Sequence, residues 1–320
     1  MPGRTGDRDR RRNRRRNSRR NREEGPPVRS SPLADRTVVV TGAARGLGAA
    51  MARQIAGRGA RLALLGHEKP ELEALAEELP GPALAVEADI TDPDALADAA
   101  ARVRAGLGPV SAVVANAGIA EGGPFPSSDP ADWARVVEVN LTGSAHTARA
   151  FLPDLFDTRG FLLQVASLAA IGAAPLMSAY CASKAGVEAF AHALRAEVAH
   201  RGVGVGIAYL NWTDTDMIRD ADRYAVLREL RGHMPPPARR VYPVEQIAAR
   251  LVTGLERRRT AVYAPAWLRL TQPVRAAMPP VVLRVARRAM PRLEAEIPFD
   301  HTGLLGAGGE ADRTASAGRR

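Results

Sequence analysis

Two residues of the stretch SAYCASKAG (178–186), Tyr180 and Lys184, have types and a spacing suited to proton transfer. Residues four apart on a helix project from one face, about one turn apart. A free tyrosine has a pKa of about 10, and a neighbouring ammonium favours the phenolate. Such a pair can protonate an alkoxide or take the proton from an alcohol. The alternative is structural, because Tyr-x-x-x-Lys pairs are common on amphipathic helices.

Lys184 is also one of only two lysines in a chain that otherwise uses arginine for its basic residues. Lysine is a compact ammonium whose pKa moves, whereas arginine is a wide fork that keeps its proton. The other lysine, Lys69, lies in the charged run HEKPELE (67–73), where a solvated side chain suffices. A site that tolerates only lysine at position 184 is one interpretation, and chance is the other.

A glycine-rich turn, TGAARGLG (41–48), lies between a predicted strand and a predicted helix. Gly42 allows a tight turn, Gly46 lets the backbone approach a phosphate, and Gly48 lets helix and strand pack closely. The free N–H groups at the start of the helix then face a pyrophosphate. The spacing G-xxx-G-x-G differs from the G-x-G-x-x-G of the best-known dinucleotide fingerprint, so an ordinary strand–helix turn is the alternative.

These residues must be positioned by an alternation of strands and helices. Continuous apolar runs, typical of strands covered on both faces, lie at 37–42, 61–66, 83–89, 110–118, 160–167, 203–210 and 260–264. Helical patterns lie between them at 46–58, 70–79, 93–106, 130–151, 177–201 and 244–257. This alternation predicts an α/β fold with a doubly wound parallel sheet of about seven strands, which binds ligands at the carboxyl ends of its strands.

Five motifs occur in the order and approximate spacing of one known family: TGAARGLG, ANAG (115–118), the Asn140 of VNLTG, Ser167, and Tyr180-x-x-x-Lys184. On these motifs the chain resembles the short-chain dehydrogenase/reductase family over residues 36 to about 263. The resemblance implies a Rossmann-type catalytic domain over 34–264. It implies an NAD(P)-dependent oxidoreductase that interconverts a carbonyl and a secondary alcohol, with Tyr180 as the general acid/base.

The same resemblance implies the roles of single residues. Ser167 hydrogen-bonds the substrate oxygen, Asn140 holds a water that relays protons to Lys184, and Lys184 tunes Tyr180 and binds the nicotinamide ribose. The implied catalytic residues are therefore Asn140, Ser167, Tyr180 and Lys184. The implied cofactor contacts are Gly42, Arg45, Gly46, Leu47, Gly48, Asp89, Ile90, Asn116, Ala117, Gly118, Tyr180, Lys184 and Thr215.

Two features bear on the choice between NAD and NADP. The second strand ends at Gly66 without a carboxylate to receive a ribose 2′-hydroxyl, and Arg45 could meet a 2′-phosphate. Both favour NADP. Glu68 favours NAD if its side chain turns back into the site, although a charge at the start of the next helix is its ordinary role. Asp89 could receive the adenine amino group or help cap the helix that begins at Pro93.

The chain departs from the family where Leu210 and Asn211 replace the usual Pro-Gly, while Thr215 keeps the threonine position. Residues 216–240 match the segment that acts as a substrate lid in this family. Their apolar side chains predict a lipophilic carbonyl or alcohol substrate. These side chains are Met217, Ile218, Tyr224, Leu227, Leu230 and Met234.

The charge lies at the two ends of the chain. Residues 1–30 have 12 arginines against 4 acids, 239–320 have 15 against 7, and 31–238 have a net charge of −6. We expect a disordered arm over 1–33. A simple solvated tail is favoured over an arm that binds nucleic acid. The segment 265–302 is basic and amphipathic, suited either to an anionic membrane or to covering the domain, and 303–320 resembles a disordered tail.

Several further expectations follow. A single cysteine, Cys181, excludes an internal disulfide, the histidines lack metal-ligand spacing, and no apolar run is long enough to span a membrane. A cytoplasmic location is therefore expected, with peripheral membrane contact through the C-terminal extension as an option. We also expect a homodimer or a homotetramer. Two other functions remain open: a regulatory protein on this fold with an arginine-rich nucleic-acid-binding arm, and an isomerase or dehydratase.

Overall fold

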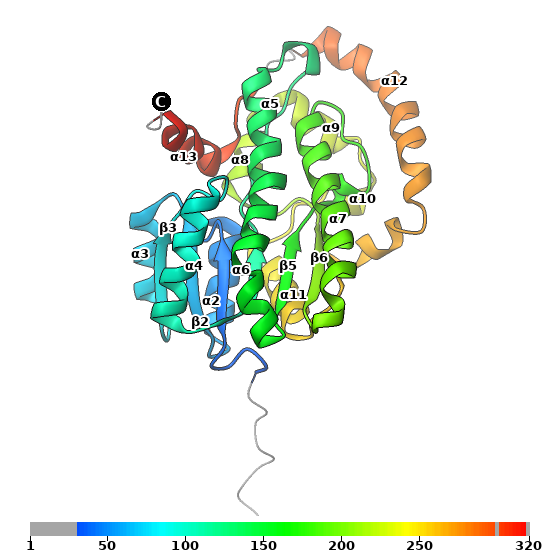
Figure 1. Ribbon diagram of the computed structural model, residues 1–320. Coiled ribbons are helices and arrows are strands. Elements are labelled where there is room, and N and C mark those ends of the chain that lie inside the picture. Colours follow the sequence, from blue (N-terminus) through cyan, green and yellow to red (C-terminus); the bar gives the residue numbers. More distant parts are fainter. Residues whose placement is uncertain (1–30, 298–300, 318–320) are drawn as a thin grey trace, which may run out of the picture. The chain divides into compact units, whose positions relative to one another are not determined.

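The structure is a computed structural model that describes residues 31–297 and 301–317. Within these residues, seven strands form one sheet in the order β3-β2-β1-β4-β5-β6-β7, and every neighbouring pair is parallel (Figure 1). The α/β fold predicted from the sequence is confirmed. The strands are β1 (Thr37–Thr41), β2 (Arg61–Gly66), β3 (Ala83–Glu87), β4 (Val110–Ala115), β5 (Phe161–Val165), β6 (Gly204–Leu210) and β7 (Ala261–Ala264).

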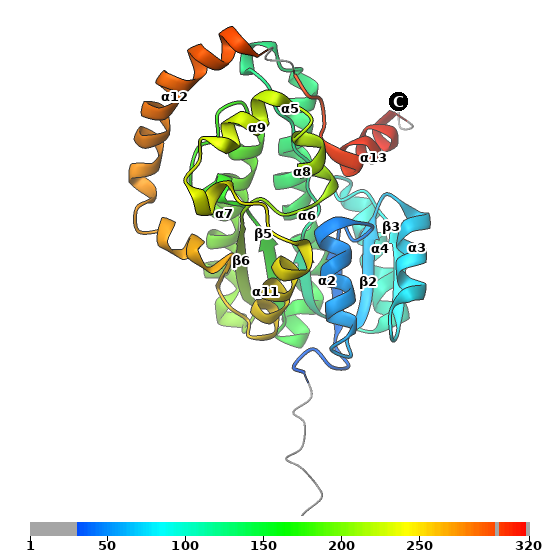
Figure 2. The same ribbon diagram turned by 180° about the vertical axis from the view of Figure 1, so that it is seen from behind.

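Helices cover both faces of this sheet, as Figures 1 and 2 show from opposite sides. Alternate strand residues point to opposite faces, so Val38 and Val40 belong to one core and Val39 to the other. One face is covered by α2 (Gly46–Ala56), α3 (Lys69–Glu78) and α11 (Val244–Glu256). The other is covered by α4 (Pro93–Leu107), α6 (Gly143–Thr158) and α7 (Ser178–Val198).

The strand order reverses between β1 and β4, because the chain builds β1 to β3 outward and then returns to place β4 on the other side of β1. A doubly wound sheet binds its ligand in the crevice at the carboxyl ends of such strands. Further elements gather at this end: α5 (Pro130–Val137), the π-helical turn η2 (Glu138–Thr142), η3 (Leu168–Ala170), α8 (Asp216–Ala221), α9 (Ala225–Gly232) and α10 (Pro236–Arg239). The short helices η1 (Phe125–Ser127) and η4 (Ala199–Arg201) complete the body of the fold.

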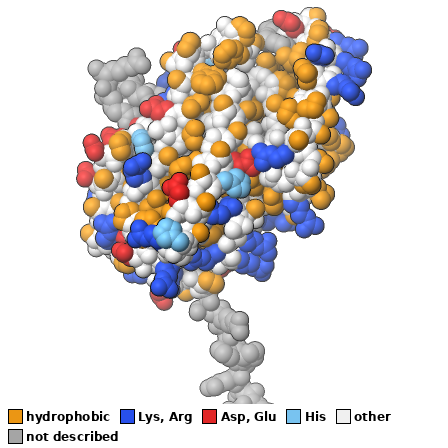
Figure 3. All heavy atoms as spheres, turned by 45° about the vertical axis from the view of Figure 1, so that its right-hand side comes forward, with side chains coloured by type: hydrophobic (Ala, Val, Ile, Leu, Met, Phe, Trp, Pro, Cys, Tyr) orange, Lys and Arg blue, Asp and Glu red, His pale blue; other side chains and the backbone are white. Residues whose placement is uncertain are grey.

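The C-terminal extension continues with η5 (Ala266–Thr271), η6 (Arg275–Ala277) and α12 (Met278–Glu296). Leu293 is buried, whereas Val281, Leu283 and Val285 are exposed. Figure 3, which brings this side forward, shows hydrophobic and basic side chains next to one another. The membrane contact expected for this segment stays a prediction. No helix of the described ranges is both long and apolar enough to cross a membrane.

The sequence-based expectation of a disordered tail over 303–320 is wrong for residues 303–317. They continue the folded unit and form α13 (Gly306–Ala317), which packs against α8. Leu304 and Leu305 are buried, and so is Asp312. The local sequence has no apolar periodicity to signal this helix, because its order comes from contacts with residues far away in the chain. Of the predicted arm 1–33, residues 1–30 lie outside the described part.

Candidate functional site

The glycine-rich turn between β1 and α2 has the geometry that only glycine adopts easily. Gly42 and Gly46 have φ angles of +62° and +52°. A Cβ on Gly42 would lie 2.8 Å from the Cα of Ala117, and one on Gly48 would collide with the carbonyl oxygen of Gly42. The turn therefore packs directly against the end of β4, as the spacing of the three glycines predicts.

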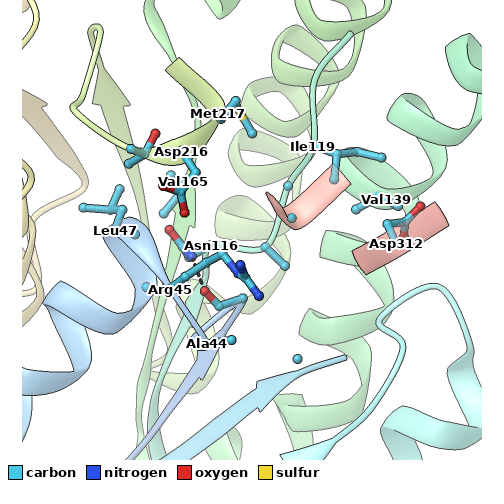
Figure 4. A pocket seen from close by; sticks show the side chains of 18 of the residues that line it. Ala44, Arg45, Leu47, Asn116, Ile119, Val139, Val165, Asp216, Met217 and Asp312 are labelled. Carbon is cyan, nitrogen blue, oxygen red and sulfur yellow. Dashed lines mark hydrogen bonds between the residues drawn. The ribbon is translucent and has the colours of Figure 1, made fainter. Parts of the chain in front are cut away.

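Polar contacts join the ends of β1 and β4. The Thr41 hydroxyl oxygen accepts hydrogen bonds from the backbone N–H groups of Asn116 (3.0 Å) and Ala117 (3.1 Å). The Asn116 side-chain amide donates to the Thr41 carbonyl oxygen at 3.0 Å. These bonds hold the predicted ANAG motif against the glycine turn, and Figure 4 shows Arg45, Asn116 and Val165 around the same pocket.

This pocket brings together the predicted cofactor contacts with the exception of Asp89. Its lining also contains Ser167, Tyr180 and Lys184, so that the glycine turn and the proposed proton donors share one cavity. Asn140 does not line it, but the neighbouring Val139 does. Among the lining residues that the sequence did not indicate are Leu305, Gly308 and Asp312, because nothing in the C-terminal sequence signals a binding role.

Lys184 projects from α7 into the interior and is only 4% exposed. Its Nζ donates a hydrogen bond to the Val165 carbonyl oxygen at 3.0 Å and lies 5.8 Å from the centre of the Tyr180 ring. A Cβ on Gly118 would lie 3.4 Å from this Nζ. Because burial disfavours the charged form, the pKa of Lys184 is lowered to about 8.

The pKa of Tyr180 is shifted in the direction opposite to the sequence-based expectation. Burial raises it to about 12, and a hydrogen bond from the Ser167 hydroxyl offsets only part of that rise. Desolvation of the phenolate is therefore the dominant influence on this pKa, while the Lys184 Nζ donates to the Val165 carbonyl oxygen. Ser167 lies just before η3, and its hydroxyl also accepts from the Ala169 N–H at 3.2 Å.

Asn140 is fully buried in η2 and is engaged by protein groups. Its Oδ1 accepts from the Ile119 N–H at 2.8 Å, and its Nδ2 donates to the Ile119 carbonyl and to the Ser183 hydroxyl, both at 2.9 Å. Its side chain thereby holds the loop after β4 close to Lys184, since a Cβ on Gly118 would lie 3.0 Å from the Asn140 Oδ1. The proton-relay role of Asn140 stays a prediction.

Charged side chains surround the part of the pocket that contains Arg45. The Arg45 guanidinium pairs with Glu68 at 2.9 Å and reaches Glu71 at 3.7 Å, so Glu68 does turn back into the site. The Nε of Arg45 is buried and has no hydrogen-bond partner among the described residues. The N-cap residue of α2 is Arg45, and its side chain makes no capping hydrogen bond. Both observations fit a phosphate-bearing ligand, because they leave buried donors to be satisfied.

Asp89 accepts hydrogen bonds from the Thr91 N–H (2.9 Å) and hydroxyl (2.8 Å). Burial is the largest single influence and raises the pKa of Asp89, but the Thr91 bonds and the charges of His67 and Arg135 together lower it below its usual range. The capping role considered for Asp89 belongs to Asp92, which accepts from two N–H groups at the start of α4.

The departure at residues 210–211 has a structural role. Asn211 is buried at the end of β6, where Leu210 lines the pocket. The Asn211 side-chain amide donates to the carbonyl oxygens of Ala238 (3.0 Å) and Arg240 (3.2 Å). It therefore fastens the end of the predicted lid segment to the sheet. Thr215 keeps its place beside the glycine turn, with its methyl group 3.4 Å from where a Gly46 Cβ would lie.

An apolar cluster adjoins Tyr180 on the side of α8 and α9. Its buried members are Ala120, Ala221, Val226, Leu227 and Leu305, and Tyr180 and Met217 pack against it. Met217 also lines the pocket (Figure 4). Among the described residues, no group of three or more His, Cys, Asp or Glu side chains is arranged to hold a metal ion.

Comparison with known proteins places residues 36–224 in the family model described as short chain dehydrogenase. An acetoacetyl-CoA reductase of Synechocystis sp. is 34% identical over 68% of this chain and 86% of its own. A short chain dehydrogenase of Pseudocercospora fijiensis is 32% identical over 65% of this chain and 71% of its own. A solved metagenomic short-chain oxidoreductase in complex with NADP is 33% identical, with a TM-score of 0.54, covering 56% of this chain and 83% of that one.

Proposed function

Because the chain belongs to the short-chain dehydrogenase family and is an NAD(P)-dependent oxidoreductase, we propose that it interconverts a carbonyl and a secondary alcohol, with Tyr180 as general acid/base. The supporting observation is that Ser167, Tyr180 and Lys184 line the same pocket as the glycine-rich turn. This supports the proposal, because the proposed proton donor and the glycine-rich turn border one cavity.

The bound nicotinamide supplies the hydride when it is reduced and accepts one when it is oxidised. Ser167 donates a hydrogen bond to the substrate oxygen and shares its developing negative charge. The Tyr180 phenol then protonates this oxygen as the alkoxide forms. The raised pKa of Tyr180 keeps the phenol protonated at neutral pH, which suits carbonyl reduction. With cofactor bound, Lys184 would donate a hydrogen bond to the nicotinamide ribose, and its charge would stabilise the phenolate that remains on Tyr180.

We assign the substrate to small lipophilic carbonyl compounds. The space beside Tyr180 adjoins the apolar cluster that includes Leu227 and Leu305, with Met217 at the pocket wall. Burying apolar substrate surface there contributes about 25 cal/mol per Å². The Synechocystis relative is named for the reduction of a carbonyl, a reaction of the same class. A homodimer or homotetramer, a cytoplasmic location and the membrane contact stay predictions.

A panel of ketones and secondary alcohols tests this proposal. We expect apolar ketones to be reduced with consumption of NADPH or NADH, with a lower KM than that of polar ketones of the same size. Cofactor absorbance and product analysis are the measurements. Product formed without net cofactor consumption would instead indicate an isomerase or a dehydratase. Binding of neither cofactor in a titration would contradict the proposal itself.

For the cofactor, we propose that Arg45 recognises the 2′-phosphate of NADP and that Glu68 limits this preference. The two side chains pair at 2.9 Å, and the carboxylate is largely buried. A phosphate that approaches Arg45 must therefore compete with Glu68 and is repelled by its charge. The balance between NADP and NAD is set by this pair.

Replacing Glu68 by glutamine is expected to lower the Kd for NADPH about three- to tenfold relative to the Kd for NADH, because it frees Arg45 and removes a negative charge. Arg45→Ala should shift the ratio of the two Kd values in the opposite direction. Fluorescence titration of both cofactors measures this ratio. The matched control is Glu73→Gln, whose side chain is exposed beside Lys69 and does not line the pocket. A ratio that is unchanged in both pocket variants would refute the assignment.

A further inference from the structure

The C-terminal segment 301–312 contributes three residues to the lining of the pocket. Leu305, Gly308 and Asp312 are among its lining residues, together with Arg45 and Lys184, and Figure 4 shows Asp312 there. The family model ends at residue 224, so the segment lies outside the part of the chain that the model matches. It nevertheless takes part in forming the pocket that the glycine-rich turn borders.

At Asp312, the segment is held by a buried ion pair. The Asp312 side chain is only 3% exposed, and its two oxygens accept from the Arg135 Nη2 (2.8 Å) and Nε (2.9 Å). The His67 Nε2 lies 3.6 Å from the same carboxylate. A bidentate pair of this kind combines strength with fixed geometry.

The ionisation of Asp312 agrees with this geometry. Burial raises its pKa, but the hydrogen bonds and charges of His67 and Arg135 outweigh burial and lower it to about 2. Arg135 also donates to the Thr91 hydroxyl at 3.1 Å and to Glu138 at 2.8 Å. The ion pair thus ties α13 to α5 and to the loop after β3 at the same point.

At the substrate end, the segment pairs with the loop that follows β4. The N–H groups of Thr302 and Leu305 donate to the carbonyl oxygens of Gly122 and Ala120, both at 2.8 Å. A buried pair between His301 and Glu121 at 2.8 Å strengthens this edge. Leu305 itself is 1% exposed and belongs to the apolar cluster beside Tyr180.

The segment also binds to the lid. The Gly306 N–H donates to the Asp220 carboxylate at 2.8 Å. Gly306 has a φ of +74°, and a Cβ there would lie 2.7 Å from the backbone of Met217. Only glycine allows so close an approach without strain. The segment therefore connects the substrate lid with Arg135 and His67.

The helix that ends the segment has little intrinsic stability. α13 begins at Gly306 and has two further glycines, Gly308 and Gly309, each of which costs about 1 kcal/mol relative to alanine within a helix. Its place is held by the tertiary contacts described above. If the Asp312–Arg135 pair opens, α13 is held only at its start, by the Gly306–Asp220 bond, and by its packing against α8.

We propose that the segment 301–312 is a wall of the cofactor site, closed by Asp312 on Arg135, and that it must open before the cofactor leaves. This rests on the proposed function in that the pocket is taken as the NAD(P) site. The segment borders the pocket through Leu305, in the apolar cluster beside Tyr180, and through Asp312, beside His67 and Arg135. A cofactor beneath it is retained between turnovers.

The test compares Asp312→Asn with the wild-type full-length chain. Asparagine keeps the size of the side chain but removes its charge, so we expect NADPH to dissociate about tenfold faster. Stopped-flow displacement of fluorescent NADPH measures the rate. Hydrogen exchange of the amides of 301–317 gives a second readout, with faster exchange expected in the variant and slower exchange expected in the wild type once cofactor is bound.

Two further variants make the result decisive. Glu310→Gln lies on the same helix with an exposed side chain and should release cofactor at the wild-type rate. Arg135→Lys keeps the charge but loses the bidentate bond, and it serves if Asp312→Asn fails to fold. If the wild type binds neither cofactor, the proposed function fails. If it binds but neither Asp312→Asn nor Arg135→Lys speeds release beyond Glu310→Gln, the wall assignment is overturned.

Discussion

Replacing Tyr180 by phenylalanine is expected to lower kcat for carbonyl reduction by about 10²- to 10⁴-fold, because the phenol is the only proposed donor of the product proton. The substitution removes one oxygen from a well-packed site and keeps the ring. We therefore expect the Kd for the cofactor to change by no more than about twofold. Steady-state kinetics and fluorescence titration on the same preparation measure the two quantities.

The matched control is Tyr263→Phe, on β7. Tyr263 stacks on Tyr209 at 5.1 Å between ring centres and does not line the pocket, so its loss should leave kcat nearly unchanged. The pH profile adds a second criterion. Because the pKa of Tyr180 is raised to about 12, wild-type reduction should not lose its proton donor near neutrality, whereas alcohol oxidation, which requires the phenolate, should accelerate with pH. A Tyr180→Phe enzyme with near-normal kcat would rule out this residue as the acid.

Replacing Lys184 by arginine is expected to reduce turnover at least about 100-fold, although the charge is conserved. The Lys184 Nζ is held at 3.0 Å from the Val165 carbonyl oxygen, and the backbone of Gly118 approaches it closely. A guanidinium is wider and planar, and this space does not accommodate it. If the larger arginine displaces Gly118, or is itself displaced from this space, cofactor binding should also weaken.

Lys69→Arg is the matched control, since Lys69 is exposed and pairs with Glu73 only at 3.9 Å. It should retain wild-type turnover and cofactor affinity. A thermal unfolding curve for each variant separates loss of chemistry from loss of the fold. Near-normal turnover in Lys184→Arg would show that the site needs only a positive charge, and the choice of lysine in an arginine-rich chain would then be coincidence.

Much of the fold could be predicted because its signals are local. The run 37–42 and the observed β1 (Thr37–Thr41) differ by one residue, and 203–210 and β6 (Gly204–Leu210) also differ by one. The spacing of the glycines likewise predicts the turn between β1 and α2, because Gly42 and Gly46 have positive φ angles there, which glycine adopts without strain. The predicted helix 130–151 was less accurate. It is divided by the turn η2, where the Asn140 side chain accepts a hydrogen bond from Ile119 in the loop after β4.

The residue types and spacings of the glycine turn and of Tyr180 and Lys184 predicted a shared site, and these residues do line one pocket, because strand ends in a parallel sheet meet at one edge. Three features were decided only by the tertiary structure: the Arg45–Glu68 pair, the raised pKa of Tyr180, and the Asp312–Arg135 pair. Each depends on burial or on partners distant in sequence. Asp312 and Arg135 are 177 positions apart, and the local pattern around either residue contains no information about the other. Desolvation and long-range pairing arise only when the chain has folded.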